Sequence, residues 1–123
     1  MRRGLVLGAL VVLGLLLMAG PAYAVKAGVR LGSERPMEYA RRILAGIWAS
    51  RGYTLTVTSG FEGAHIEGSL HYQGLAEDYR RYDVRPDDLP GMLAEARTRL
   101  GSDYDVILES DHIHVEYDPK VRV

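Results

Sequence analysis

The sequence contains no cysteine. This absence excludes disulfide bonds, thiolate metal sites and enzymes that use a cysteine nucleophile. A small domain without disulfides has a limited core, and a bound metal is one alternative source of stability. Histidine is also scarce. The chain has four, and three of them stand in two short segments, SLHYQGLAEDYR at residues 69–80 and DHIHVEYD at residues 111–118. These two segments are the candidates for a metal site.

An excess of positive charge is also missing. The formal net charge is −1, and removal of residues 1–24 would take away two arginines and no acid, which changes it to −3. A mildly acidic domain of this kind excludes nucleic acid as the expected partner. The densest basic group is Arg80, Arg81 and Arg85, but aspartates at positions 78, 83, 87 and 88 interleave with it. We therefore expect a solvated ion-pair loop there.

The first 24 residues are typical of a secretory signal peptide. Two arginines begin the segment, an apolar run covers residues 5–19, and PAYA at 21–24 ends in the small-x-small pattern that signal peptidase recognises. The apolar run is about 15 residues long, shorter than the ~20 that a membrane-spanning helix needs. We expect cleavage after Ala24, export to the periplasm, extracellular space or cell wall, and no membrane attachment afterwards. An uncleaved membrane anchor is the alternative.

The rest of the chain has the length of one domain. Residues 25–32 are rich in glycine and are expected to form a flexible lead-in, and residues 33–123 form the domain itself. We expect this domain to be a monomer.

Apolar spacing predicts two helices. The first covers residues 33–52, with Ser33 as N-cap and Gly52 at its end, and Arg41 falls outside its buried stripe. The second covers residues 87–101, with Asp87 or Asp88 as N-cap. The predicted buried stripes are Met37, Ala40, Ile43, Leu44, Ile47 and Trp48 in the first helix, and Leu89, Met92, Leu93, Ala96 and Leu100 in the second.

Four strands are predicted between and after the helices, at residues 53–58, 75–79, 104–108 and 112–117. The last two are separated by a tight connection and are expected to form a hairpin. The element order is helix, strand, loop, strand, helix and hairpin. It predicts an α+β domain with a small antiparallel sheet and two helices packed on one side.

Alternation along the last strand places His112, His114 and Glu116 on one face. The residues between them, Ile113 and Val115, point into the core. Two imidazoles on a polar face, backed by an apolar face, form a rigid platform for a ligand.

A turn at Gly74 is expected to return the chain, so that His71 and Asp78 converge. Two histidines and one aspartate suit Zn²⁺, and three protein ligands leave the fourth position to water, as in catalytic sites. Zinc in such a site lowers the pKa of its water and polarises a carbonyl group.

The segment SLHYQGLAED resembles the S-x-H-x-x-G-x-A-x-D motif of the zinc D-Ala-D-Ala carboxypeptidases. The segment DHIHVEYD resembles the His-x-His motif of the wider group, which includes the lysostaphin-type peptidases and the Hedgehog signalling domain. The order and spacing of VTSGFEGAHIEGSLHYQGLAEDYR, GMLAEA and ESDHIHVEYD are similar to the Hedgehog domain from about residue 33 to residue 118. The resemblance implies a Hedgehog/DD-peptidase-like zinc domain.

By position, the resemblance implies that His71, Asp78 and His114 are the zinc ligands. It implies that His112 lies beside the metal-bound water or the substrate. It also implies that His65 belongs to the substrate site.

The resemblance leaves two candidates for the general base. The carboxypeptidase pattern places the base three residues before the last ligand, at Asp111, whereas the Hedgehog pattern places it further upstream, at Glu109. Strand alternation and the longer reach of glutamate favour Glu109. Either carboxylate needs a proton-accepting state near neutral pH and a hydrogen bond to the water.

The function implied by the resemblance is that of a secreted zinc metallopeptidase. Its partners are peptidoglycan stem peptides, cut by D-Ala-type carboxypeptidase or endopeptidase action. The carboxypeptidases often carry an arginine after the Ser-Gly of the first strand, where this chain has Phe61-Glu62, so a preference for free C-terminal D-Ala is not implied. The alternatives are a non-catalytic, zinc-stabilised Hedgehog-like binding module and a globular protein without metal.

Overall fold

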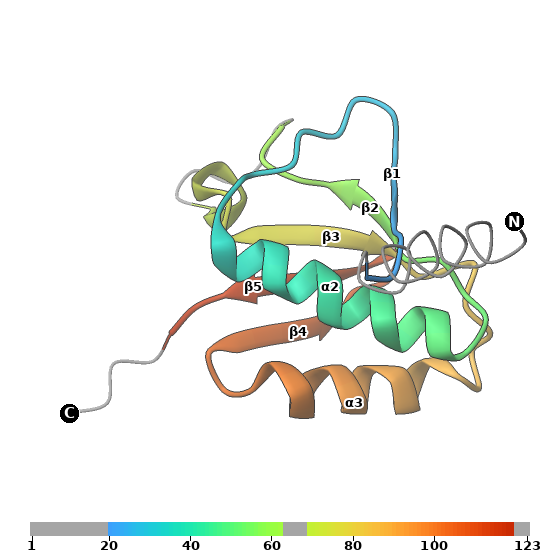
Figure 1. Cartoon of the computed structure of the whole chain (residues 1–123). Helices are drawn as coiled ribbons and strands as arrows, with labels where there is room; N and C mark the ends of the chain where they lie inside the picture. Colours follow the sequence, from blue (N-terminus) through green and yellow to red (C-terminus); the bar gives the residue numbers. More distant parts are fainter. Residues whose placement is uncertain (1–19, 63–68, 120–123) are drawn as a thin grey trace, which may run out of the picture.

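The computed structural model of the chain describes residues 20–62 and 69–119, and Figure 1 shows their arrangement. These residues form an α+β domain with a five-stranded sheet and two α-helices. The elements in chain order are β1 (Ala24–Val25), α2 (Arg35–Ser50), β2 (Thr56–Ser59), the short 3-10 helix η1 (Leu70–Gln73), β3 (Ala76–Arg80), α3 (Leu89–Leu100), β4 (Tyr104–Leu108) and β5 (His112–Tyr117).

The sheet has the strand order β1-β2-β3-β5-β4. The predicted hairpin of β4 and β5 is confirmed, and β3 pairs antiparallel with both β2 and β5. The prediction of an antiparallel sheet is wrong at one edge, because β1 pairs parallel with β2 and the sheet is mixed. A two-residue strand in a glycine-rich stretch has no alternation that sequence analysis can detect.

The edge strand β1 is held by backbone hydrogen bonds. The amide of Ala24 donates to the carbonyl of Leu55 at 2.8 Å, and the amide of Lys26 donates to that of Val57 at 2.9 Å. The bond between Ala24 and Val25, where cleavage is predicted, therefore lies inside β1. Further along the predicted lead-in, the carbonyl of Arg30 accepts a hydrogen bond from the Phe61 amide at 3.1 Å.

Both helices and one face of the sheet share a single hydrophobic core. The helices contribute most of the predicted stripe residues, and alternate residues of β2, β3, β4 and β5 supply the sheet side, namely Val57, Tyr79, Val106, Ile113 and Val115. The opposite face carries the polar side chains of Asp78, Arg80, His112 and His114. Neither α2 nor α3 is long and apolar enough to cross a membrane, and no other helix in the described residues is.

The predicted position of Arg41 outside the buried stripe is wrong. Arg41 is only 5 % exposed. In this buried position its Nε donates to Oε1 of Glu77 on β3 at 3.0 Å, and its Nη2 donates to the carbonyl of Gly32 at 2.9 Å. The hydroxyl of Tyr79 donates to the same Glu77 oxygen at 2.9 Å. A charge can be buried in this way only when it is paired.

One of the two predicted helix caps is wrong. The N-cap of α2 is Glu34 instead of Ser33, whereas the N-cap of α3 is Asp88, one of the two predicted residues, although its side chain makes no capping hydrogen bond. The Asp88 carboxylate instead accepts a hydrogen bond from the hydroxyl of Tyr53. Both helices have a proline in the first turn, which presets the backbone for helix entry.

Candidate metal centre

The sheet face opposite the helices carries the two halves of the predicted site. On β5, Ile113 and Val115 are buried in the core while His112 and His114 point to the other face, so the predicted alternation is confirmed. The register pairs His114 directly with Asp78 on β3. Residues opposite each other on neighbouring strands project from the same face, which places these two side chains side by side.

The third group, His71, reaches the site through the turn before β3. The hydroxyl of Ser69 accepts a hydrogen bond from the His71 amide at the start of η1, and Gly74 ends η1 with a φ of 71°. Glycine adopts this left-handed conformation without steric cost. The predicted turn at Gly74 thus folds His71 back over β3. In this position His71 is buried, with 3 % of its surface exposed.

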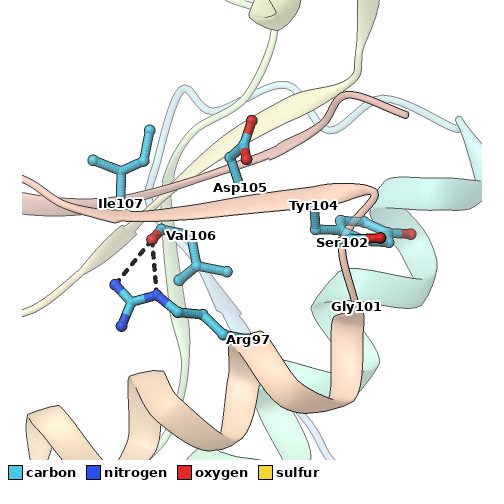
Figure 2. Close-up of a pocket in the computed structure, with 7 residues that line it drawn as sticks. All are labelled: Arg97, Gly101, Ser102, Tyr104, Asp105, Val106 and Ile107. Carbon is cyan, nitrogen blue, oxygen red and sulfur yellow. Dashed lines mark hydrogen bonds between the residues drawn. The ribbon is translucent and has the colours of Figure 1, made fainter. Parts of the chain in front are cut away.

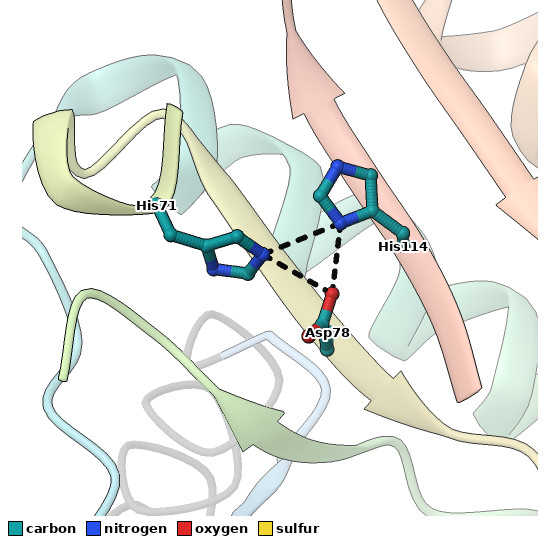
Figure 3. Close-up of side chains that lie close together, drawn as sticks. All are labelled: His71, Asp78 and His114. Atoms are coloured by element: carbon teal, nitrogen blue, oxygen red, sulfur yellow. Dashed lines mark hydrogen bonds and ion pairs between the residues drawn. The ribbon is translucent and has the colours of Figure 1, made fainter. Parts of the chain in front are cut away.

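His71, Asp78 and His114 converge on one point, as Figure 3 shows. Nε2 of His71 lies 3.3 Å from Nδ1 of His114 and 3.3 Å from Oδ1 of Asp78, and the last two atoms lie 2.9 Å apart. For zinc bonds of about 2.0–2.1 Å, the edges of a tetrahedron are about 3.3–3.4 Å long. The three atoms therefore form a triangle close in size to one face of a tetrahedral zinc site.

The remaining nitrogen of each imidazole is held by an acceptor outside the triangle. Nδ1 of His71 lies 2.8 Å from the carbonyl of Gly60, and Nε2 of His114 lies 3.2 Å from a carboxylate oxygen of Glu116. Each acceptor fixes the proton on that nitrogen, so the other nitrogen of a neutral ring presents a lone pair. Two imidazole lone pairs and one carboxylate oxygen then face one another, an arrangement that a cation stabilises.

Position 60, whose carbonyl contacts Nδ1 of His71, requires glycine for steric reasons. A Cβ atom at this position would overlap the carbonyl of Arg30, so no larger residue fits without moving the backbone. In the sequence, Gly60 is evident only as the glycine of the Ser-Gly in the first strand, and Glu116 only as a neighbour of the histidines on their strand face. Their contacts with His71 and His114 depend on how these side chains are oriented in the fold, and no local pattern signals them.

The protonation of the triangle follows from these contacts. Burial acts to raise the pKa of the Asp78 carboxyl, but hydrogen bonds from His114 and His71 outweigh it and hold that pKa well below its usual range. The hydrogen bond to Asp78 raises the pKa of His114 against the opposing effect of burial. Because its pKa is raised, His114 holds its second proton up to a higher pH than an unperturbed histidine, and a metal ion that binds this ring would have to displace that proton.

We expect zinc affinity to rise with pH below the raised pKa of His114 and to level off above it. Zinc binds only the neutral ring, so each binding event below that pKa releases a proton and the dissociation constant falls about tenfold per pH unit. Calorimetric titration of the full chain in buffers from about pH 5.5 to 8 measures this slope. An affinity that does not change with pH would exclude a histidine-ligated ion.

His112 lies at the rim of the triangle. Its Nε2 is 3.6 Å from Oδ1 of Asp78, and its Nδ1 is 2.6 Å from a carboxylate oxygen of Asp111. The Asp111 side chain is 83 % exposed, so this carboxylate faces solvent and holds His112 from outside. The structure thus joins Asp111 to His112 and brings both next to the three predicted ligands.

Two other predicted site residues are not brought into the triangle. Glu109 is exposed between β4 and β5, where its amide donates to the His112 carbonyl at 2.9 Å. Within residues 20–62 and 69–119, its carboxylate makes no hydrogen bond or ion pair. His65 lies outside the described residues.

A second group of acidic side chains lies on the same sheet face, where β4 pairs with β5. One carboxylate oxygen from each of Asp105, Glu116 and Asp118 lies within 4.8 Å of the others. Glu116 is shared with the first site through its contact with His114. An all-oxygen group of this kind suits a harder cation than zinc, so the two groups can be distinguished by their ligand atoms.

A further hollow in the described surface lies away from the triangle. Its volume is about 460 Å³, and it is lined by the end of α3 and by β4 (Figure 2). There Arg97 donates two hydrogen bonds to the carbonyl of Val106, at 3.2 and 3.0 Å, and Asp105 projects to the other side of the strand. These hydrogen bonds of Arg97 join α3 to β4.

Comparison with protein-family models finds no matching family, and comparison with curated proteins finds no match.

Proposed function

We propose that the chain is a secreted zinc-dependent hydrolase that cleaves peptide bonds of peptidoglycan stem peptides. The observation that carries the proposal is the convergence of Nε2 of His71, Nδ1 of His114 and Oδ1 of Asp78 within 3.3 Å of one another. The choice of peptide substrate is supported by the resemblance of both motifs to zinc peptidases and by the signal-like first 24 residues.

The residues present fit zinc. Two neutral imidazoles with fixed tautomers and one carboxylate form a three-ligand set, which leaves a fourth position for water or substrate. Zinc bound there would lower the pKa of a coordinated water and polarise the substrate carbonyl.

The chain itself must move a proton, and His112 is placed to do so. Asp111 accepts a hydrogen bond from Nδ1–H of His112, which leaves the Nε2 lone pair directed toward the triangle. We assign to Nε2 of His112 the role of general base. It accepts a proton from the attacking water and returns this proton to the leaving amine. Asp111 is then a positioning residue that stabilises the imidazolium. Glu109 remains the alternative base, and its carboxylate would have to turn inward from the hairpin.

Purified murein sacculi incubated with the full chain test the activity. We expect new amino or carboxyl termini to appear with zinc, to stop with a chelator and to return when zinc is restored. His112→Gln is expected to reduce turnover by at least ~100-fold with zinc content unchanged, because general acid–base catalysis contributes that much or more. Glu109→Gln and the exposed control Asp87→Asn are expected to stay within a few fold of wild type.

The opposite pattern, with Glu109→Gln inactive and His112→Gln active, would assign the base to Glu109. Bound zinc without any turnover of sacculi would contradict the hydrolase. It would favour the zinc-stabilised binding module, since the three ligands come from η1, β3 and β5 and an ion would join these segments.

A further inference from the structure

A second cavity adjoins the metal centre on the same sheet face. Its volume is about 300 Å³, and it shares Asp78 and His112 with that centre. Arg80 follows Asp78 by two residues on β3 and is paired in register with His112. The described residues that line it are Lys26, Thr58, Asp78, Arg80, Tyr82, Asp111 and His112.

Lys26 and Arg80, the basic residues in the described lining, have no acidic partner within residues 20–62 and 69–119. Both aspartates in the lining are engaged elsewhere, Asp78 with His114 and Asp111 with His112. Among the residues that the structure describes, neither the Lys26 nor the Arg80 side chain forms an ion pair or a hydrogen bond. The expected ion-pair loop is therefore wrong for Arg80.

Arg80 shows the clearest sign of a missing partner. Its Nε is buried and has no hydrogen-bond acceptor in the described part of the chain, although leaving a buried donor unsatisfied is unfavourable. Its guanidinium carbon lies 4.9 Å from the centre of the Tyr82 ring. Contact with the ring positions the planar guanidinium, while its remaining N–H groups are available to an acceptor.

We propose that Arg80, assisted by Lys26, forms a subsite for a carboxylate group of the ligand that occupies the metal centre. A planar guanidinium binds a carboxylate through two parallel hydrogen bonds, and Lys26 adds a second positive charge. The nearby Asp78 and Asp111 disfavour a doubly charged phosphate more than a singly charged carboxylate. In identifying this ligand as a peptide substrate, the inference rests on the proposed function.

The test is calorimetric titration of the zinc-loaded full chain with small uncleaved probes. The acid N-acetyl-D-alanine is compared with its amide, and N-acetyl-D-isoglutamine supplies a side-chain carboxylate instead of a terminal one. We expect at least one acid to bind about tenfold or more tightly than the amide, and which acid it is identifies the source of the carboxylate. Equal binding of all three probes, or tighter binding of inorganic phosphate, would overturn the assignment.

Single substitutions identify the residues that cause the preference for the acid over the amide. Arg80→Gln is expected to abolish the preference for the acid, Arg80→Lys to keep part of it, and Lys26→Gln, at an exposed position, to weaken it a few fold. The control Arg42→Gln removes an exposed arginine of α2 and is expected to change nothing. Circular dichroism establishes that each variant is folded. A preference that survives in Arg80→Gln would refute the subsite.

The two proposals fail separately. Loss of acid preference in Arg80→Gln together with no turnover of sacculi would leave the subsite standing without the hydrolase. Turnover of sacculi with no acid preference would leave the hydrolase standing without the subsite.

Discussion

Zinc binding is expected to fall from about one ion per chain to almost none when Asp78 is replaced by asparagine. The substitution keeps the shape of the side chain but removes the charge that balances the ion. Loss of even an outer-shell partner weakens metal binding by about 10–100-fold, so loss of a ligand is expected to cost at least ~100-fold. Equilibrium dialysis followed by metal analysis gives the stoichiometry, and competition with a chromophoric chelator gives the affinity.

Asp87→Asn is the matched control, since it makes the same chemical change at an exposed position outside the site. It is expected to bind zinc like the wild type. If Asp78→Asn kept both the stoichiometry and the affinity, the ion would have to be held elsewhere, for example by Asp105, Glu116 and Asp118.

The second large effect concerns stability. Arg41→Ala is expected to lower the free energy of unfolding by about 3–5 kcal/mol, because it leaves the Glu77 carboxylate buried without its charged partner. Arg41 and Glu77 are 5 % and 1 % exposed, so solvent cannot take over this role. Urea unfolding, followed by circular dichroism, measures the change. The exposed neighbour Arg42→Ala is the control and is expected to change stability by less than about 0.5 kcal/mol.

The pH dependence of the free energy of unfolding of Arg41→Ala provides a second check. Burial raises the pKa of Glu77, and Arg41 opposes that rise. Without Arg41 the folded-state pKa lies further above the unfolded value, so protonation at low pH favours the folded state. The deficit of Arg41→Ala should therefore shrink as pH falls. A loss of less than about 1 kcal/mol at neutral pH would mean that the ion pair contributes little.

The convergence of His71, Asp78 and His114 could be predicted from the sequence because two local patterns specify it. Strand alternation places His114 on the polar face, and the turn at Gly74 brings His71 close to Asp78. Both rules act over a few residues. The central strands, the hairpin and the buried helix stripes follow from the same short-range periodicity.

The features that could not be predicted depend on partners distant in sequence. The buried position of Arg41 needs Glu77, which is 36 residues away, and an arginine on a helix carries no mark of such a partner. The pairing of β1 with β2 similarly depends on backbone hydrogen bonds that any short segment can make. The cavity at Arg80 gathers side chains from several strands, so the charge pattern around Arg80 alone suggested only a solvated loop.

The most direct test of the candidate metal centre is X-ray absorption at the zinc edge on the full chain incubated with zinc. The geometry of His71, Asp78 and His114 predicts four-coordinate zinc with two imidazole nitrogens and oxygen ligands at about 2.0–2.1 Å. The imidazole scattering should disappear in part when either histidine is replaced by alanine. A six-coordinate shell of oxygen atoms, or zinc that does not bind at all, would contradict the site described for this protein.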